Sequence, residues 1–209
     1  MGNNPYERQL HVGPFIGADA TRSSGRAAKT GEQVMSQVHA ALREPSSRKK
    51  LFFAQAIVTA PVIWTTEAGT GGPLLYNPSS SVEANIIAVG YGITTASTVS
   101  ASIGLTGGYA ESAPTSTTAI DSQGCLYVDA STPVCSVYRV GTTGTNRWFL
   151  PVGDVGTGAV TVNTTQVNWV NIDGMITVPY QSFVSIAASA TLSTAVMNIV
   201  LVWEEVPVA

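Results

Sequence analysis

Short apolar or alternating runs, separated by turn signals, extend from Leu51 to the end of the chain, and they limit the possible folds more than any other feature. Within Thr98–Leu105, for example, apolar residues alternate with hydroxyl residues, as in a half-buried strand. Turn signals such as Asn77-Pro78, Gly107-Gly108 and Asp173-Gly174 recur about every 8–15 residues. No segment of this region has a helical period. The pattern predicts strands at 51–58, 62–66, 74–76, 84–93, 98–105, 125–128, 134–140, 147–152, 160–172, 175–178, 183–187 and 196–205.

Many short strands without helices indicate a sandwich or a barrel. About ten strands in residues 51–209 fit an all-β, single jelly-roll-like antiparallel β-sandwich. An immunoglobulin-like sandwich is the second choice, because the Cys…Trp…Cys spacing of that fold is missing.

The charges divide the chain into two parts. Residues 1–50 carry 8 basic and 4 acidic residues, a formal charge of +4, whereas residues 51–209 carry 2 basic and 9 acidic residues, a formal charge of −7. Both histidines and all lysines lie in the first part. We therefore predict a basic N-terminal arm at 1–50 and a β-sandwich body at 51–209.

The arm has no strand pattern, and most of it reads as an extended segment that becomes ordered against a partner. Thr30-Gly31-Glu32-Gln33 fits a capping box, and apolar residues follow at helical spacing. The sequence therefore predicts one short helix at about 31–43, which ends before Pro45.

The body lacks the residues on which most catalytic and metal sites depend. Without His or Lys it has no usual proton shuttle or amine nucleophile, so we expect no enzyme, cofactor or metal site. Glu204 and Glu205 follow each other on a predicted strand and point to opposite faces, so they cannot share a substrate.

Cys125 and Cys135 would face each other if 129–133 formed a hairpin loop. Two states are then open for them, a disulfide or two buried thiols.

Two segments carry a family resemblance. One is Leu74-Leu75-Tyr76-Asn77-Pro78 followed by the apolar strand 84–89, and the other is the C-terminal run Val200-Leu201-Val202-Trp203-Glu204-Glu205-Val206-Pro207-Val208. Together they resemble tailed-bacteriophage virion structural proteins of this size. The resemblance covers the body but not the arm, and it implies a jelly-roll subunit that serves as a capsid-associated, decoration, spike or fibre protein.

We therefore expect a non-enzymatic virion structural protein that assembles through the flanks of its sandwich into a homotrimer or a larger assembly. Only 11% of the residues are charged, against about 25% in a typical protein, which favours a subunit covered by neighbours. The arm would anchor the subunit to neighbouring copies or other virion proteins through Phe15, Ile16, Arg22, Arg26, Arg48, Lys49 and Lys50.

Nucleic acid and a receptor or glycan are the two alternative partners. Nucleic acid is the less favoured partner of the arm, because a charge of +4 over 50 residues is modest and acidic residues interleave with the basic ones. The alternative function is the receptor- or glycan-binding head of a phage fibre or spike, with Tyr109 as the aromatic residue expected to be exposed. No apolar run is long enough to predict a membrane span.

Overall fold

The computed structural model describes residues 26–27, 33–34, 49–61, 63–65, 73–95, 97–120, 122–125, 132–142, 144–155, 168–192 and 194–208. The chain divides into two compact units, Met1–Glu44 and Pro45–Ala209. In the first unit, β1 (Arg26–Ala27) pairs antiparallel with β2 (Gln33–Val34). Gln33 and Val34 are thus strand residues inside the range predicted as a helix. The rest of 31–43 lies outside the described residues.

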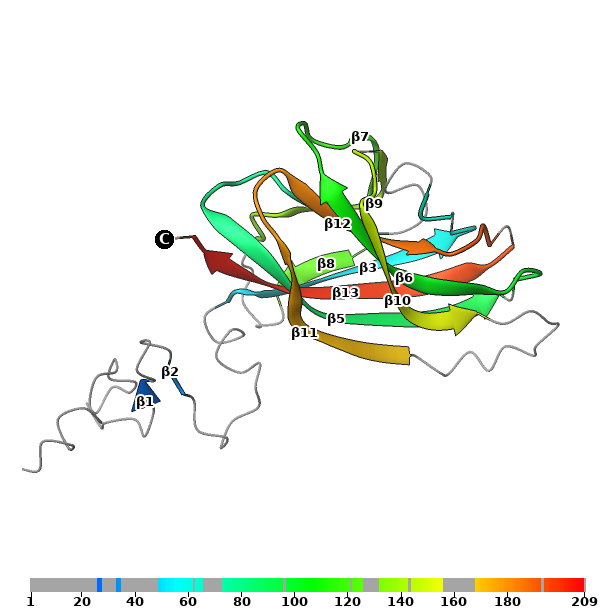
Figure 1. The fold of residues 1–209 in the computed structure, drawn as a ribbon, viewed down its shortest axis with the longest axis horizontal. Coiled ribbons are helices and arrows are strands. Elements are labelled where there is room, and N and C mark those ends of the chain that lie inside the picture. The colour runs from blue at the N-terminus through cyan, green and yellow to red at the C-terminus, as the bar shows by residue number, and fades with distance from the viewer. Residues whose placement is uncertain are drawn as a thin grey trace, which may run out of the picture. The chain divides into compact units, whose positions relative to one another are not determined.

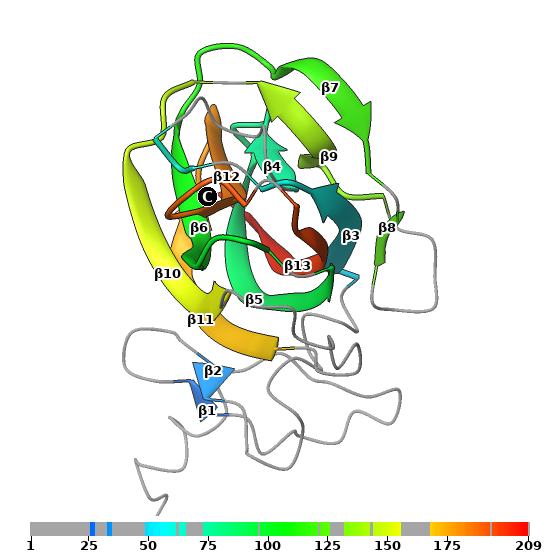
Figure 2. The same cartoon turned by 90° about the vertical axis from the view of Figure 1, so that its right-hand side faces the viewer.

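The second unit is all-β and consists of two antiparallel sheets (Figures 1 and 2). The six-stranded sheet has the order β10-β6-β12-β4-β9-β7, and the five-stranded sheet has the order β11-β5-β13-β3-β8. The strands are β3 (Leu51–Thr59), β4 (Leu74–Asn77), β5 (Val82–Thr95), β6 (Ala101–Tyr109), β7 (Thr115–Ala119), β8 (Ser122–Cys125), β9 (Ser136–Thr142), β10 (Trp148–Val155), β11 (Asn168–Val178), β12 (Ser182–Ala188) and β13 (Val196–Pro207).

The core lies between the two sheets and follows from the period of two in each strand. On β3, Phe52, Ala54, Ala56 and Val58 are buried, and on β13 Ile199, Leu201 and Trp203 are buried. They belong to one cluster with side chains of the other sheet, among them Leu75, Leu105 and Ile186. The rings of Phe52 and Trp203 stack with their centroids 5.9 Å apart. This shared apolar core holds the sheets together, because each large side chain contributes about 1.5–3 kcal/mol when it is buried.

The central strand of the five-stranded sheet is the C-terminal β13. It pairs with β3 from Val196 to Glu204 and with β5 from Val196 to Pro207. The end of the chain is therefore built into the middle of the fold and is flanked on both sides by much earlier segments.

Two local predictions were wrong. The predicted turn at Asp173-Gly174 does not separate two strands but forms a bulge within β11, where the register with β5 shifts between Asn171 and Ile176. Asp173 and Gly174 both have positive φ, 52° and 77°. The two residues therefore adopt the backbone conformation of a turn, but they do so within a bulge of the strand. The second wrong prediction is a Gly/Ser/Thr-rich loop at 107–118, which the Gly107-Gly108 signal would begin. These residues include the end of β6 and part of β7.

The structure also bears on the two alternatives left open for the cysteines. The strand that contains Cys125, β8, pairs with β3 in the five-stranded sheet, whereas β9, which follows Cys135, pairs with β4 and β7 in the other sheet. The two segments therefore do not form the hairpin that would have brought the cysteines face to face. Cys135 is a free, buried thiol, as in the second of the two alternatives.

Candidate functional site

Most of the predicted anchoring residues lie outside the described residues. This holds for Phe15, Ile16, Arg22 and Arg48, while Arg26 is described only through its backbone in β1. Lys49 and Lys50 are described, and both are half-buried. The anchoring role of this set stays a prediction.

The described body begins at these two lysines. Lys49 has a positive φ of 59°, and the carbonyl of Lys50 accepts a hydrogen bond from the N–H of Glu205 at 2.9 Å. The point where the body begins is thus attached to the end of β13. Any force transmitted along this segment would act directly on the central strand of the five-stranded sheet.

A buried carboxylate occupies the same end of the body. The side chain of Glu205 is 1% exposed. Its Oε2 accepts from the N–H of Val134 at 3.0 Å, and its Oε1 accepts from the N–H of Cys135 at 2.9 Å and from the indole N–H of Trp203 at 3.5 Å. Burial, followed by the charge and hydrogen bond of Glu205, raises the pKa of the Cys135 thiol. These contacts make Glu205 a link between the two sheets.

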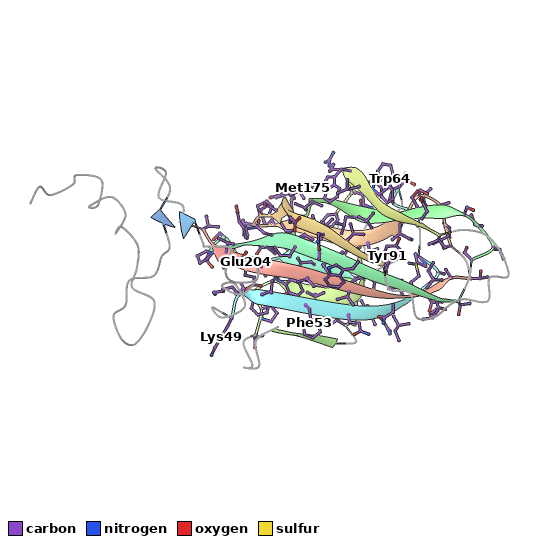
Figure 3. The ribbon with its side chains drawn as sticks, turned by 90° about the horizontal axis from the view of Figure 1, so that it is seen from below. Lys49, Phe53, Trp64, Tyr91, Met175 and Glu204 are labelled. Atoms are coloured by element: carbon purple, nitrogen blue, oxygen red, sulfur yellow. The ribbon has the colours of Figure 1, made fainter. Side chains whose placement is uncertain are left out.

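The separation of Glu204 and Glu205 was predicted correctly. Glu205 is buried, whereas Glu204 is half-buried and lies on the opposite side of β13 (Figure 3). The sequence did not reveal that Glu205 would be enclosed by donors, because two of these, the N–H groups of Val134 and Cys135, are distant in the chain.

The outward face of the five-stranded sheet carries an apolar cluster, which we call the outer patch. It consists of Leu51, Phe53, Ile87, Ala88, Val200 and Val202. Phe53 alternates with the core residue Phe52 and therefore lies on the opposite face of β3 (Figure 3). Two exposed side chains extend this face, Ile57 and Trp169, both 53% exposed.

Trp169 lies flat on the sheet because its partner on β5 is a glycine. Trp169 pairs with Gly90, where a Cβ would lie 2.7 Å from the indole ring and 3.7 Å from Val200. Leu51, Ile87, Ala88 and Val202 of the outer patch are buried within the chain, so the exposed apolar surface of this face comes mainly from Ile57 and Trp169. These two side chains are a candidate contact with another protein.

Tyrosines gather at one end of the six-stranded sheet, and we call them the tyrosine rim. It consists of Tyr76, Tyr109, Tyr138 and Tyr180. Burial raises the pKa of Tyr76, and the nearby Tyr180, Tyr109 and Tyr138 raise it further. Tyr109 and Tyr180 are 52% and 46% exposed, so the predicted exposure of Tyr109 is confirmed, although it lies at the end of β6 and not in a loop.

Gln181 holds the exposed tyrosines in place. Its side-chain oxygen accepts from the Tyr109 hydroxyl at 2.7 Å, and its side-chain nitrogen donates to the carbonyl of Glu111 at 3.1 Å. A pocket of about 200 Å³ adjoins this turn, and its lining includes Gly108, Pro179 and Ser182. No sequence signal marked Gln181, because its partners come from other strands.

Within the described residues we find neither a membrane-spanning helix nor a cluster of three or more potential metal ligands. No protein-family model and no curated protein matches this chain.

Proposed function

We propose that this chain is a structural subunit of a bacteriophage virion, which acts through assembly and not through catalysis. In this proposal the body packs against neighbouring subunits in a homotrimer or larger assembly, and residues 1–50 anchor it to neighbouring copies or other virion proteins. The observation that carries the proposal is the exposure of two large apolar side chains, Ile57 and Trp169, on the outward face of the five-stranded sheet, since such residues on a body with few charges favour protein contact.

We further propose that the body is a jelly roll. If β3, β4, β5, β6, β10, β11, β12 and β13 are counted 1 to 8 in chain order, the two sheets read 1-8-3-6 and 2-7-4-5. Two Greek keys wound together give this order, in which the chain alternates between sheets except from strand 4 to strand 5, and the last strand lies between the first and third. Strands β7, β8 and β9 are then additions at the far edges of both sheets, inserted between β6 and β10.

The charge division supports the role of the arm. A +4 segment of 50 residues and a −7 body attract each other between copies, whereas a genome would repel the body. In this proposal Phe15 and Ile16 would pack against apolar surface of the neighbouring subunit, and the basic residues would orient the arm on its acidic body.

The size of the full chain in solution tests the assembly function. We expect light scattering to give a trimer or larger species at physiological salt, and Ile57→Asp to shift it toward the monomer by placing a charge on the outward face. Met175→Asp is the matched control, because Met175 is 76% exposed in the bulge of β11. A monomeric wild-type chain, or equal effects of both variants, would contradict the proposal.

Deletion of residues 1–50 tests the arm. We expect the shortened chain to keep the β-sheet circular dichroism of the full chain but to be lost from particles. Normal incorporation of a folded, shortened chain would show that the arm is not the anchor. Binding of the full chain to DNA that disappears with the arm would favour the nucleic-acid alternative.

A second candidate function is the receptor- or glycan-binding head of a fibre or spike. It is favoured by the exposed Tyr109 and Tyr180 at one end of the six-stranded sheet, because carbohydrate sites combine exposed rings with hydrogen-bonding groups.

A further inference from the structure

Gln181 has a backbone conformation that its residue type disfavours. The turn 179–182 is closed by a hydrogen bond of 3.1 Å from the N–H of Ser182 to the carbonyl of Pro179. Gln181 is the third residue of this turn and has a φ of 54°, where glycine or asparagine is usual. A left-handed conformation at such a residue costs about 1–3 kcal/mol and persists only where the surroundings fix it.

Four hydrogen bonds fix Gln181. Besides the two side-chain bonds described above, its N–H donates to the carbonyl of Asn77 at 2.9 Å and its carbonyl accepts from the N–H of Ala110 at 2.7 Å. The turn is therefore bound to the ends of β4 and β6. Gln181 thereby fixes the Tyr109 hydroxyl and the backbone next to Tyr180.

The result is an exposed ring, Tyr109, whose hydroxyl is held, and a second exposed ring, Tyr180, whose backbone lies in the fixed turn. Tyr109 and Tyr180 are about half exposed, yet the Tyr109 hydroxyl is held and Tyr180 follows a proline within the fixed turn. Rings held in advance lose little entropy when they bind a ligand. The strain at Gln181 thus coincides with preorganised aromatic surface, the combination expected at a binding site and not in an ordinary turn.

The chemistry of the rim indicates a neutral ligand. Phenol hydroxyls and an amide both donate and accept hydrogen bonds, and the ring faces can lie against the C–H face of a sugar. The formal charge of −7 on residues 51–209 opposes a polyanion such as nucleic acid. A pocket of about 200 Å³ adjoins the rim through Gly108, Pro179 and Ser182, but Tyr109, Tyr180 and Gln181 do not line it, so the ligand would lie on the exposed rings and not in this pocket.

We propose that Tyr109, Tyr180 and Gln181 form a binding site for a neutral pyranose unit of a glycan. The two rings provide the stacking surface, and the tyrosine hydroxyls with the Gln181 amide bind the sugar hydroxyls. The site rests on the second candidate function, and it is independent of the outer patch, which lies on the other sheet.

The full chain should first be applied to an array of neutral and sialylated oligosaccharides. We expect binding to neutral structures, with little gain from sialic acid. The best-bound neutral oligosaccharide then serves as the probe for titration calorimetry. An array that stays blank with folded protein, or binding confined to sialylated glycans, would overturn the proposal.

Variants locate the site. Tyr109→Ala and Tyr180→Ala should each weaken binding of the probe about tenfold or more, as expected for central aromatic contacts. Tyr109→Phe keeps the ring and should weaken binding only about two- to fivefold through loss of the bond to Gln181. Val99→Ala is the control, since Val99 is exposed but precedes β6 at the end opposite Tyr109, and it should leave binding unchanged.

Thermal unfolding of each variant shows whether the fold is kept. If Val99→Ala lowers affinity as much as Tyr109→Ala while both remain folded, the site is not at the tyrosine rim. Because the oligomer is measured separately, loss of glycan binding with an intact assembly rejects this site alone. Intact glycan binding by a monomer rejects the assembly function alone.

Discussion

The Glu205 carboxylate accepts a hydrogen bond of 2.9 Å from the backbone N–H of Cys135, and this bond joins the central strand of one sheet to the segment that leads into β9 of the other. Both residues are buried. A single side chain near the C-terminus thus fixes the spacing of the two sheets at the end where the described body begins.

Removal of this carboxylate should strongly destabilise the body. Glu205→Ala leaves the buried N–H of Cys135 and the half-buried N–H of Val134 without their acceptor. We expect the free energy of unfolding to fall by about 3 kcal/mol, and by about 1–2 kcal/mol in Glu205→Gln, which keeps one oxygen. Urea unfolding measures both. Glu111→Ala, the same change at an exposed position, should stay within about 0.5 kcal/mol of the wild type, and equal effects of the two alanine variants would refute the link.

The Cys135 thiol should be unreactive in the native protein and should make folding sensitive to alkali. Its pKa is raised in the folded state by burial and by Glu205, whereas an unfolded cysteine titrates near pH 8.5. The raised pKa means that the folded state holds the proton more tightly than the unfolded state. This contribution to stability is therefore fully present below about pH 8.5 and is lost as the pH rises toward the folded-state value.

Two measurements check this behaviour. In a Cys125→Ser background, a thiol reagent at pH 7.5 should label Cys135 only after denaturant is added. Between pH 8 and 10.5 the urea midpoint should fall less steeply in Cys135→Ala than in the wild type. Some slope should remain, because burial also raises the pKa of Tyr76 and Tyr91. Rapid native labelling, or parallel slopes in the two proteins, would contradict the expectation.

The strands could be predicted because their signal is local. Alternation along β13 is set by which side chains face the core, so the opposite directions of Glu204 and Glu205 could be predicted from the sequence. The all-β, two-sheet class follows from the same signal. The helix proposed near 31–43 stays a prediction beyond Gln33 and Val34.

Pairing and the candidate sites depended on distant residues, and there the sequence was less informative. Cys125 and Cys135 are ten positions apart, but their segments join different sheets. The strand that contains Cys125, β8, pairs with β3, and the strand that follows Cys135, β9, pairs with β4. Asp173-Gly174 has the local chemistry of a turn, yet long pairing with β5 keeps both sides in one strand. Gln181 gave no signal, since its importance arises from contacts with β4 and β6.

Two glycines should resist substitution for different reasons. A Cβ on Gly153 would collide with the buried Tyr91 hydroxyl, so Gly153→Ala should destabilise the body by about 2 kcal/mol through overpacking. Gly174 has open space around it but a φ of 77°, so Gly174→Ala should lose about 1 kcal/mol through backbone strain alone.

The Tyr91→Phe background separates these two causes. Removing the hydroxyl should recover part of the loss in Gly153→Ala and none of the loss in Gly174→Ala, as measured in a double-mutant cycle by urea unfolding. Additive effects of Tyr91→Phe and Gly153→Ala would mean that the collision is relieved in another way.

Asn77 should be as important for stability as an apolar core residue. It is fully buried, and its amide nitrogen donates to the carbonyls of Val82 and Val178, at 2.8 and 3.0 Å, while its oxygen accepts from the N–H of Ser79. This one side chain thereby joins β4 of the six-stranded sheet to β5 and β11 of the other. Asn77→Ala leaves three buried or half-buried backbone groups without a partner, so we expect a loss of about 3 kcal/mol in the free energy of unfolding.

Asn77→Asp tests whether the donors matter. The side chain keeps its shape, but an acceptor replaces the nitrogen that faces two carbonyls, so this variant should be at least as unstable as Asn77→Ala. Asn168→Ala, at an exposed position on β11, is the matched control and should change stability by less than about 0.5 kcal/mol. A stable Asn77→Asp protein would show that the amide bonds contribute little. Because the backbone carbonyl of Asn77 also receives the N–H of Gln181, a destabilised β4 end should loosen the tyrosine rim before the whole body unfolds, and hydrogen exchange at Gln181 would detect this.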